Sequence, residues 1–422
     1  MNSPHSLPGA DDITRLSLPN GITILIRTNP NSPSASMSGF LHAGSLFDTD
    51  EKLGRSTFAT SALMRGTQKL SFEEIYNELE SVGAGLGFSA GAHTTSFSGR
   101  ALAEDLPLLF ELMAQALRTP VFPPDEVERL RNQILTGLAL RSQDTGEMAA
   151  MTFDRLIFGD HPYARPDDGY PETIKALTRD DLLDYHHSCF GPRGLTLAVV
   201  GAVEPGLVAE LVNQSLGDWQ NDAQLPSPPL PEAKGLEKSV REHIPLLGKS
   251  QTDLLLGVLG PKRRDPEYLA ASLGNSVLGQ FGMMGRIGDV VREQSGLAYY
   301  ASSSMSGGTG PGSWEVSAGV NPSNLEKALD LIIAELKLFT EKGVSVAELR
   351  DCQDHFVGRL PLSMESNAGV ANALINIERH QLGLDYYRNY EDQVRAVTPG
   401  MVLEATRKYI DPELLAIATS GP

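Results

Sequence analysis

Four side chains of types that commonly bind metal ions fall within the six residues DYHHSC: Asp184, His186, His187 and Cys189. The surrounding sequence predicts a helix, on which adjacent residues point about 100° apart, so the four groups cannot converge on one ion. Structural zinc sites use spaced pairs of ligands instead. The pattern therefore favours the end of a helix with mixed exposure over a metal site.

A further histidine, His161, lies in the segment FGDHPYARP, where Pro162 and Pro166 indicate a rigid turn. This context favours a structural role for His161 over a catalytic one. The chain has two cysteines, Cys189 and Cys352, which are too few for a disulfide framework. Both are predicted to be buried thiols.

Four glycines recur at every third residue in LGQFGMMGRIGDVV, at positions 279, 282, 285 and 288. A phosphate-binding loop would need a different pattern that includes a lysine. A spacing of three on a helix gives a smooth face that allows close packing. We therefore expect this segment to be a packing helix, and the following SGGTGPGSWEVSAG to be a hairpin connection that enters a strand.

Charge and hydropathy limit the partners of the chain. Its 422 residues carry 53 acidic against 35 basic side chains and a formal net charge of −18, which argues against nucleic acid and anionic membranes as partners. No apolar run approaches the length of a membrane span, and the N-terminus lacks a basic segment followed by an apolar one. We expect a cytoplasmic protein, with the periplasm as the alternative if a signal peptide has been trimmed.

The chain repeats itself at about half its length. The segment that begins at Asp105 matches the one that begins at Asn324, at an offset of 219 residues, and both have the pattern of two amphipathic helices with a short break. The segment from Ile174 matches the one from Val394 at an offset of 220, and both have the pattern of a helix, a proline turn and an apolar strand. Two matches at nearly one offset predict a duplicated domain.

The Pro-rich stretch QNDAQLPSPPLPEAKG, residues 220–235, is typical of an extended linker, so we expect domains at 1–219 and 236–422. Strands at both ends of each half, with helices between them, predict the α+β class. Each domain is expected to be a mostly antiparallel sheet with helices covering one face. Within them, Asn20-Gly21 predicts a hairpin, and Ser323–Glu326 and Ser345–Glu348 fit the capping box that starts a helix.

Several short segments, in this order and spacing, resemble the pitrilysin-like or insulinase family of zinc peptidases, family M16. They are LPNGITILI, AGSLFD, LMRGT, FGDHPYARP, REQSGLAYY and the final AIATSGP, and together they extend over nearly the whole chain. The family includes the mitochondrial processing peptidase and the core proteins of the cytochrome bc1 complex. The resemblance includes the tandem repeat.

In active members of the family an inverted zinc motif, His-x-x-Glu-His, precedes the segment that is here LMRGT. The resemblance places Thr57, Thr60 and Ser61 at the three functional positions of that motif. The third zinc ligand, a glutamate on a later helix, falls on Gly137 or a neighbour, and residues 136–141 contain no acid. Because hydroxyl groups are poor zinc ligands, the resemblance implies that this half holds no catalytic zinc.

In the second half, the resemblance gives a role to Arg292 and Tyr299 of VREQSGLAYY. In active peptidases an arginine and a tyrosine of this segment reach the catalytic centre, where arginine can hold a substrate carbonyl and tyrosine can donate to the oxyanion. Taken alone, the pair would favour simple packing; within the whole-chain match it favours retained function. Gly296 is expected to separate a helix from a strand, and Tyr300 to face away from Tyr299.

His93, in SAGAHTTSF, corresponds to a strand that faces substrate in relatives, and it is the candidate substrate-binding residue of the first half. If this half binds neither zinc nor substrate, that strand would serve only for packing.

The resemblance thus implies the zinc-lacking subunit of a two-subunit peptidase, inactive alone, that acts on peptides held as an added strand. The implied partner is a homologous M16 subunit with an intact His-x-x-Glu-His motif, and the zinc is expected in that partner while this chain needs no cofactor. Two alternatives remain open. One is an inert scaffold like the bc1 core proteins, and the other is a peptide-binding chamber formed by a homodimer.

Overall fold

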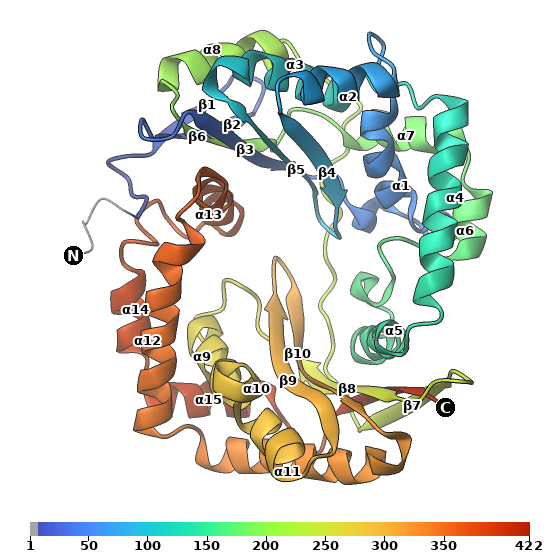
Figure 1. The fold of residues 1–422 in the computed structure, drawn as a ribbon, viewed down its shortest axis with the longest axis vertical. Coiled ribbons are helices and arrows are strands. Elements are labelled where there is room, and N and C mark those ends of the chain that lie inside the picture. Colours follow the sequence, from blue (N-terminus) through green and yellow to red (C-terminus); the bar gives the residue numbers. More distant parts are fainter. Residues whose placement is uncertain (1–6) are drawn as a thin grey trace. The chain divides into compact units, whose positions relative to one another are not determined.

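The computed structural model describes residues 7–422, which form two compact units of three segments each (Figure 1). Unit 1 contains the chain up to Gly137, Pro166–Pro229 and Leu360–Asn389. Unit 2 contains Leu138–Arg165, Leu230–Arg359 and Tyr390–Pro422. Each unit therefore includes one segment from the other half of the chain. The expected domain limits, with a linker at residues 220–235, were drawn from the sequence repeat and stay a prediction.

Unit 1 is built on a six-stranded sheet with the order β1-β2-β6-β3-β5-β4. All neighbouring strands are antiparallel except β2 and β6, which are parallel. The β1–β2 hairpin turns at Gly21, whose φ of 95° favours glycine, as Asn20-Gly21 predicts. The strands are β1 (Thr14–Ser17), β2 (Thr23–Thr28), β3 (Ser34–Leu41), β4 (Gly85–Ala90), β5 (Thr95–Leu102) and β6 (Thr196–Gly201).

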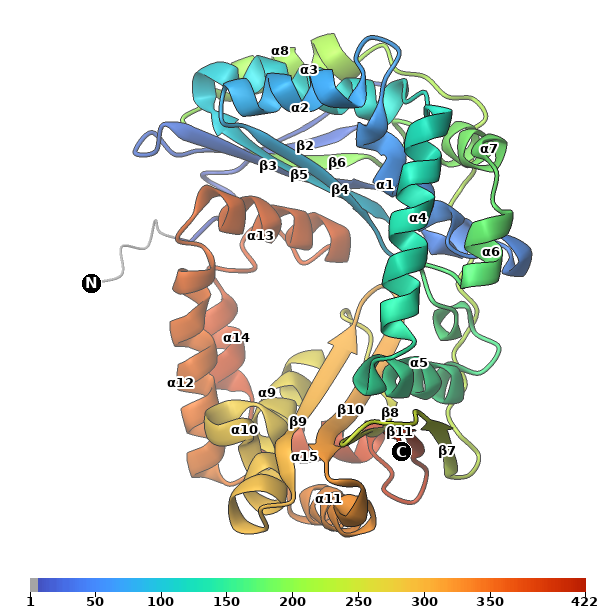
Figure 2. The same cartoon turned by 45° about the vertical axis from the view of Figure 1, so that its right-hand side comes forward.

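Helices lie on both faces of this sheet, which corrects the expected cover on one face only, because a helix from the other half of the chain packs on the second face (Figure 2). Helices α3 and α8 contact it on one face, and α13 packs on the other, where its apolar side meets Leu25, Phe40 and Ala198. The helices of unit 1 are α1 (Arg55–Ala62), α2 (Phe72–Ser81), α3 (Leu106–Arg118), α4 (Pro124–Arg141), α6 (Pro171–Ala176), α7 (Arg179–Cys189), α8 (Pro205–Leu216) and α13 (Asn367–His380). Helix α4 continues by its last turn into unit 2.

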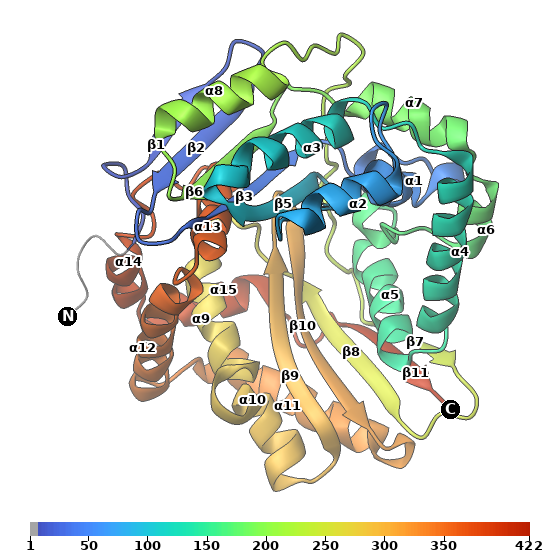
Figure 3. The ribbon, with the colours of Figure 1, turned by 45° about the horizontal axis from the view of Figure 1, so that its top comes forward.

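Unit 2 is built on a five-stranded sheet with the order β7-β11-β8-β10-β9. Only β7 and β11 are parallel among these neighbours, and β9 and β10 form a long hairpin at one edge (Figure 3). The central strand β8 is a nearly continuous buried run, as expected of a strand covered on both faces. The strands are β7 (Val240–Pro245), β8 (Thr252–Leu259), β9 (Ala298–Gly307), β10 (Pro311–Val320) and β11 (Ala416–Gly421).

The sheet of unit 2 also has helices on both faces. Its main core joins one face to helices α9, α11 and α15. On the other face, α5 packs against β8 and β11, and the contact consists of Ala149, Phe153, Ile157, Leu255, Ala416 and Ala418. The helices are α5 (Thr145–Phe158), α9 (Tyr268–Gly279), α10 (Phe281–Gly288), α11 (Leu325–Lys342), α12 (Val346–Ser363), α14 (Tyr390–Ala396) and α15 (Pro399–Tyr409), of which α12 ends in unit 1.

The two units repeat one architecture, which confirms the predicted α+β class with two tandem, mostly antiparallel domains. Strand β6 corresponds to β11 and helix α7 to α15, both at an offset of 220 residues (196 to 416 and 179 to 399). Helix α5 corresponds to α13 at an offset of 222 (145 to 367). These last two helices are exchanged between the units, so each sheet has its own helices on one face and a helix of the other half on the opposite face.

Two local predictions are wrong. Ser323 does not cap α11, because the side chain of Asn321 accepts from the backbone N–H of Ser323 and caps a preceding 3-10 turn, Pro322–Asn324. The glycines at 279–288 do not share one helix face, because α9 ends at Gly279 and the left-handed φ angles of Gly282 and Gly285 accompany the break. The capping box of Ser345 and Glu348 is confirmed, with N–H bonds of 2.8 and 3.2 Å.

Within residues 7–422 the helices are all too short or too polar to cross a membrane. Both cysteines are free and buried, as predicted.

Candidate functional site

The three positions that the sequence assigns to a zinc motif lie on α1 of unit 1, and two of them have internal hydrogen bonds. Thr60 is 1% exposed, and its hydroxyl lies 3.0 Å from that of Thr95 on β5. The hydroxyl of Thr57 donates to the backbone oxygen of Asp167 at 2.7 Å. Ser61, one residue beyond Thr60, is exposed. This set offers no imidazole and no carboxylate, so it does not fit zinc.

The first turn of α1 is held by a buried carboxylate. Asp48 accepts from the backbone N–H of Ser56 at 3.1 and 3.2 Å and from its hydroxyl at 2.9 Å, and it pairs with Arg55 at 3.5 Å. Burial raises the pKa of Asp48 to about 6, although the Ser56 bonds and Arg55 oppose the shift. Gly54 begins the turn with a φ of 86°, a conformation that favours glycine. The network anchors the helix and involves no exposed reactive group.

Gly137, which the sequence assigns with its neighbours to the third zinc ligand, lies exposed on α4. A Cβ added there would meet no other atom of the described chain within 4 Å, so the absence of an acid at this position is not imposed by space. Across residues 7–422, His, Cys, Asp and Glu side chains do not gather in any group of three that could hold a metal ion.

Two of the histidines singled out in the sequence, His186 and His161, have structural contacts. His186 on α7 lies 2.9 Å from the backbone oxygen of Leu117, and burial lowers its pKa to about 4. Its neighbour His187 is exposed, so the two rings do not converge, as the sequence predicts. His161 is 6% exposed, accepts from the N–H of Tyr163 at 3.1 Å, and lies 3.1 Å from the Pro231 oxygen. Burial lowers the pKa of His161 as well.

In unit 2, Arg292 lies on a short π-helical segment, Asp289–Gln294, directly before β9. Such π-helical turns are frequent at functional sites. The backbone leaves the turn at Gly296, whose φ is 63°, and the N–H of Gly296 donates to the Arg292 oxygen at 2.9 Å. The Arg292 side chain is about one third exposed, and its Nε lies 3.6 Å from a carboxylate oxygen of Glu293.

Two adjacent tyrosines at the start of β9 differ sharply in the exposure of their side chains. Tyr299 is 79% exposed, well above the other exposed aromatic side chains, Tyr76, Tyr170 and Phe281. Tyr300 points to the opposite face of the strand, where its hydroxyl donates to Asp253 at 2.7 Å. Burial and the nearby Asp253 raise the pKa of Tyr300.

Asp253 is 3% exposed and is the acceptor of a small network in unit 2. Besides Tyr300, Gln251 donates to it at 2.8 Å, and the hydroxyl of Thr145 on α5 also donates to it. Tyr300 is thus a structural residue, whereas the phenol of Tyr299 is presented to solvent.

His93 lies in the turn between β4 and β5, which corrects its expected place on a strand. The reason is local: the N–H of Gly91 donates to the oxygen of Thr94 at 3.0 Å, and this closes a tight turn around Ala92 and His93. Its proposed part in substrate binding remains a prediction.

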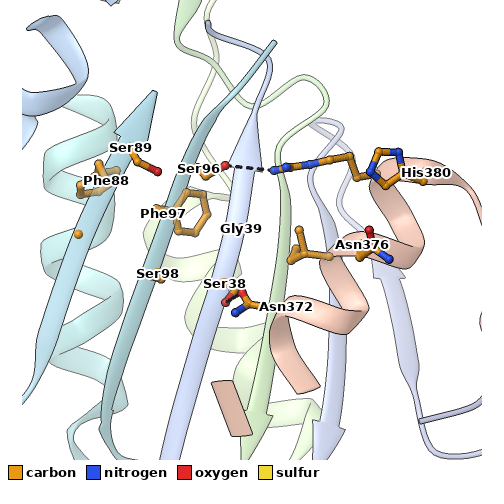
Figure 4. Close-up of a pocket in the computed structure, with 13 residues that line it drawn as sticks. Ser38, Gly39, Phe88, Ser89, Ser96, Phe97, Ser98, Asn372, Asn376 and His380 are labelled. Carbon is orange, nitrogen blue, oxygen red and sulfur yellow. Dashed lines mark hydrogen bonds between the residues drawn. The ribbon is translucent and has the colours of Figure 1, made fainter. Parts of the chain in front are cut away.

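The sequence did not single out a cavity of about 530 Å³ in unit 1, between the sheet and α13 (Figure 4). Asn372, Asn376 and Arg379 of α13 line it together with serines of three strands. Their spacing of four and three residues puts them on one side of the helix, and this polar stripe on an otherwise apolar helix was the available signal.

Two family models match the chain. The model described as "Insulinase (Peptidase family M16)" matches residues 23–156, and the one described as "Peptidase M16 inactive domain" matches residues 176–355. An uncharacterized zinc protease of Streptomyces coelicolor is 28% identical over 371 residues, which cover 87% of this chain and 80% of the relative. The beta subunit of the mitochondrial-processing peptidase of Saccharomyces cerevisiae is 27% identical over 374 residues, or 84% and 79% of the two chains.

Two crystal structures have the same fold. The peptidase M16 inactive domain from Pseudomonas fluorescens superposes with a TM-score of 0.90 at 25% identity, covering 97% of this chain and 98% of that one. A protease from Helicobacter pylori gives a TM-score of 0.90 at 18% identity, covering 99% and 100%.

Proposed function

The chain belongs to peptidase family M16, and we propose that it is the non-zinc-binding subunit of a heterodimeric M16 metallopeptidase. The observation that carries this proposal is the exposure of Tyr299 next to the half-buried Tyr300, whose hydroxyl is bonded to Asp253. An aromatic side chain that is 79% exposed contributes little to the stability of its own fold. Its position therefore suits a function outside the chain.

In this proposal Arg292 and Tyr299 act on a peptide bound in the zinc site of a homologous partner subunit. The planar guanidinium of Arg292 holds a backbone carbonyl of the substrate. The hydroxyl of Tyr299 donates a hydrogen bond to the oxyanion that develops on the scissile carbonyl, a contact that strengthens in the transition state. The chain's own α1 provides no metal ligands, so the metal belongs to the partner, whose intact His-x-x-Glu-His motif would hold it.

The proposed substrates are peptides or extended segments. Strand β4 is an edge strand of its sheet, and an edge presents unpaired backbone groups to which an extended peptide can add as a further strand. Backbone pairing of this kind is independent of most side chains, so it suits a peptidase that accepts many sequences.

A specific observation also favours the rival function of an inert scaffold. The hydroxyls of Thr57 and Thr60 have internal hydrogen bonds, which supports a purely structural role for this region. A scaffold, or a homodimeric peptide-binding chamber, would retain the fold without any need for an exposed Arg292 and Tyr299.

Reconstitution separates these functions. We expect the purified chain alone to retain no stoichiometric zinc after mild chelator treatment and to cleave no peptide, and we expect cleavage to appear when a zinc-binding M16 subunit of the same organism is added. Elemental analysis and a fluorogenic peptide assay are the measurements. One zinc per chain after chelation, or full activity of the zinc-binding subunit without this chain, would contradict the proposal.

A further inference from the structure

The cavity between the sheet of unit 1 and α13 has a hydroxyl-rich floor (Figure 4). Side chains alternate along strands, so Ser38 of β3, Ser96 and Ser98 of β5 and Ser89 of β4 share one face of the sheet. Two hydrogen bonds show that this face is turned to α13. The Ser38 hydroxyl donates to Asn372 at 2.8 Å, and Arg379 donates to the Ser96 oxygen at 3.1 Å.

The wall of the cavity adds a positive charge. Helix α13 contributes Asn372, Asn376, Arg379 and His380, and among the described residues that line the cavity none is acidic. The Arg379 guanidinium is partly buried and lies 4.6 Å from the ring centroid of Phe40. Burial lowers the pKa of Arg379, because the charged form loses hydration there. The cavity therefore combines a desolvated guanidinium with a cluster of neutral hydrogen-bond donors.

Glycine keeps the cavity open on the side of the edge strand. A Cβ added to Gly87 of β4 would meet no other atom within 4 Å, so the space over this residue is free in the described structure. Its backbone has ordinary strand geometry and pairs with Ser98 of β5. The volume of about 530 Å³ falls within the ~300–1,000 Å³ of typical ligand pockets.

From this arrangement we infer that the cavity binds a carboxylate group of a peptide, with Arg379, Ser96 and the amide groups of α13 as its donors. A guanidinium with neighbouring hydroxyl and amide donors matches the acceptor-only chemistry of a carboxylate. The group is either the C-terminal carboxylate or an acidic side chain of the peptide. This inference rests on the proposed function in taking peptides as ligands, and it uses residues that the proposed catalytic role does not.

Arg379 also has a structural contact, since it stacks on Phe40 and bonds to Ser96, and the test must separate the two roles. The variant Gly87→Val adds side-chain volume to the cavity from β4, where an added Cβ has free space, and it leaves Arg379 itself unchanged. Valine is well accommodated in a strand. Arg379→Gln removes the charge but retains a polar group. Arg15→Gln is the matched control, because Arg15 pairs with Glu378, the neighbour of Arg379, and does not line the cavity.

The experiment is calorimetric titration of the full chain, without a partner subunit, with three N-acetylated tetrapeptides. The first has alanines and a free C-terminal carboxylate, the second is its C-terminal amide, and the third is an amide with one glutamate. We expect the first or the third to bind about 10- to 100-fold more tightly than the second, as for a hydrogen-bonded charge. Whichever binds identifies the source of the carboxylate.

Gly87→Val and Arg379→Gln should each abolish that preference, while Arg15→Gln should retain it. Thermal unfolding of each variant shows whether the fold is intact, and if Arg379→Gln fails to fold, Gly87→Val decides alone. Equal binding of all three peptides, no binding of any of them, or unchanged preference in Gly87→Val would overturn the inference. Because no cleavage is measured, these results are independent of whether Arg292 and Tyr299 act in trans.

Discussion

Helix α1 of unit 1 and the Arg292–Tyr299 segment of unit 2 show two opposite relations between proposed functional positions and the fold. On α1, the hydroxyls of Thr57 and Thr60 are fixed by internal hydrogen bonds, and Thr60 is almost fully buried. In unit 2, Tyr299 is 79% exposed while its neighbour Tyr300 is bound to Asp253.

The comparison gives physical terms for the proposed loss of a zinc site on α1 and the proposed retention of function in unit 2. At the proposed zinc positions, Thr57 and Thr60 take part in internal hydrogen bonds, so these two side chains contribute to stability. At Tyr299, an exposure of 79% indicates that the stability of the fold depends little on this side chain. Restoring metal ligands on α1 should therefore cost stability, whereas changing Tyr299 should cost little.

The largest expected effect comes from rebuilding the zinc motif with Thr57→His, Thr60→Glu and Ser61→His together. Glutamate at position 60 would replace a threonine that is 1% exposed and bonded to Thr95, so we expect a loss of about 3 to 5 kcal/mol in the free energy of unfolding. Zinc binding should be weak at best, since the later glutamate and the outer hydrogen bonds that orient ligands are missing.

Denaturant unfolding and zinc titration of the triple variant provide the measurement, with Ser61→His alone as the control because Ser61 is exposed. A stable triple variant that binds zinc tightly and cleaves peptide would show that the chain has lost only its ligands. In that case, the proposal that these positions now serve only the stability of the fold would be wrong.

A second effect is the pH dependence of stability that comes from His186 on α7, the helix that contacts α1. The pKa of His186 on α7 is lowered to about 4 from 6.5, so between these values the unfolded chain binds more protons and the stability of the fold rises with pH. This contribution is fully present above about pH 6.5 and is lost as the pH falls toward 4. The difference amounts to about 3 kcal/mol by linkage.

The variant His186→Gln removes this titration while it retains a donor near the Leu117 oxygen. We expect the unfolding free energy of the parent to fall more steeply than that of the variant between pH 6.5 and 4. Parallel curves for the two proteins would mean that His186 is solvated in solution and that this side of α1 is less tightly packed than the structure shows.

The smallest of these effects distinguishes the two tyrosines. Tyr300→Phe removes one donor from the buried Asp253, so it should cost about 1 to 3 kcal/mol of stability and leave turnover of the reconstituted peptidase unchanged. Tyr299→Phe should leave stability within about 0.5 kcal/mol of the parent, as is usual for exposed positions. If the stability effects are reversed, the assignment of the structural and the exposed tyrosine is wrong.

The sequence predicts most of the fold because its signals are local and periodic. The repeat offset of 220 residues is reproduced in β6 and β11, and Asn20-Gly21 and Ser345–Glu348 form the expected turn and cap. The exchange of α5 and α13 could not be predicted, because an amphipathic pattern shows that a helix packs but not on which sheet. The capping of α11 was missed because Asn321 competes with Ser323 one turn earlier.

The candidate site was only partly predictable for a similar reason. The exposure of Tyr299 and the inward orientation of the half-buried Tyr300 follow from strand alternation, which is a local property. The cavity of unit 1 depends on contacts between residues far apart in the chain, such as Ser96 and Arg379, which are 283 residues apart. Single-sequence periodicity carries no information about such pairs.

The most direct test of the central claim is turnover of the reconstituted heterodimer with Tyr299→Phe and, separately, Arg292→Ala in this chain. Loss of one donor to the oxyanion should lower turnover by roughly 10²- to 10³-fold for Tyr299→Phe. Arg292→Ala should lower turnover and also raise the Michaelis constant, because it also weakens the hold on the substrate. Zinc content and subunit association should stay at parental values. Turnover within about twofold of the parent in both variants, a change of only ~0.4 kcal/mol, would contradict the account and leave the scaffold function.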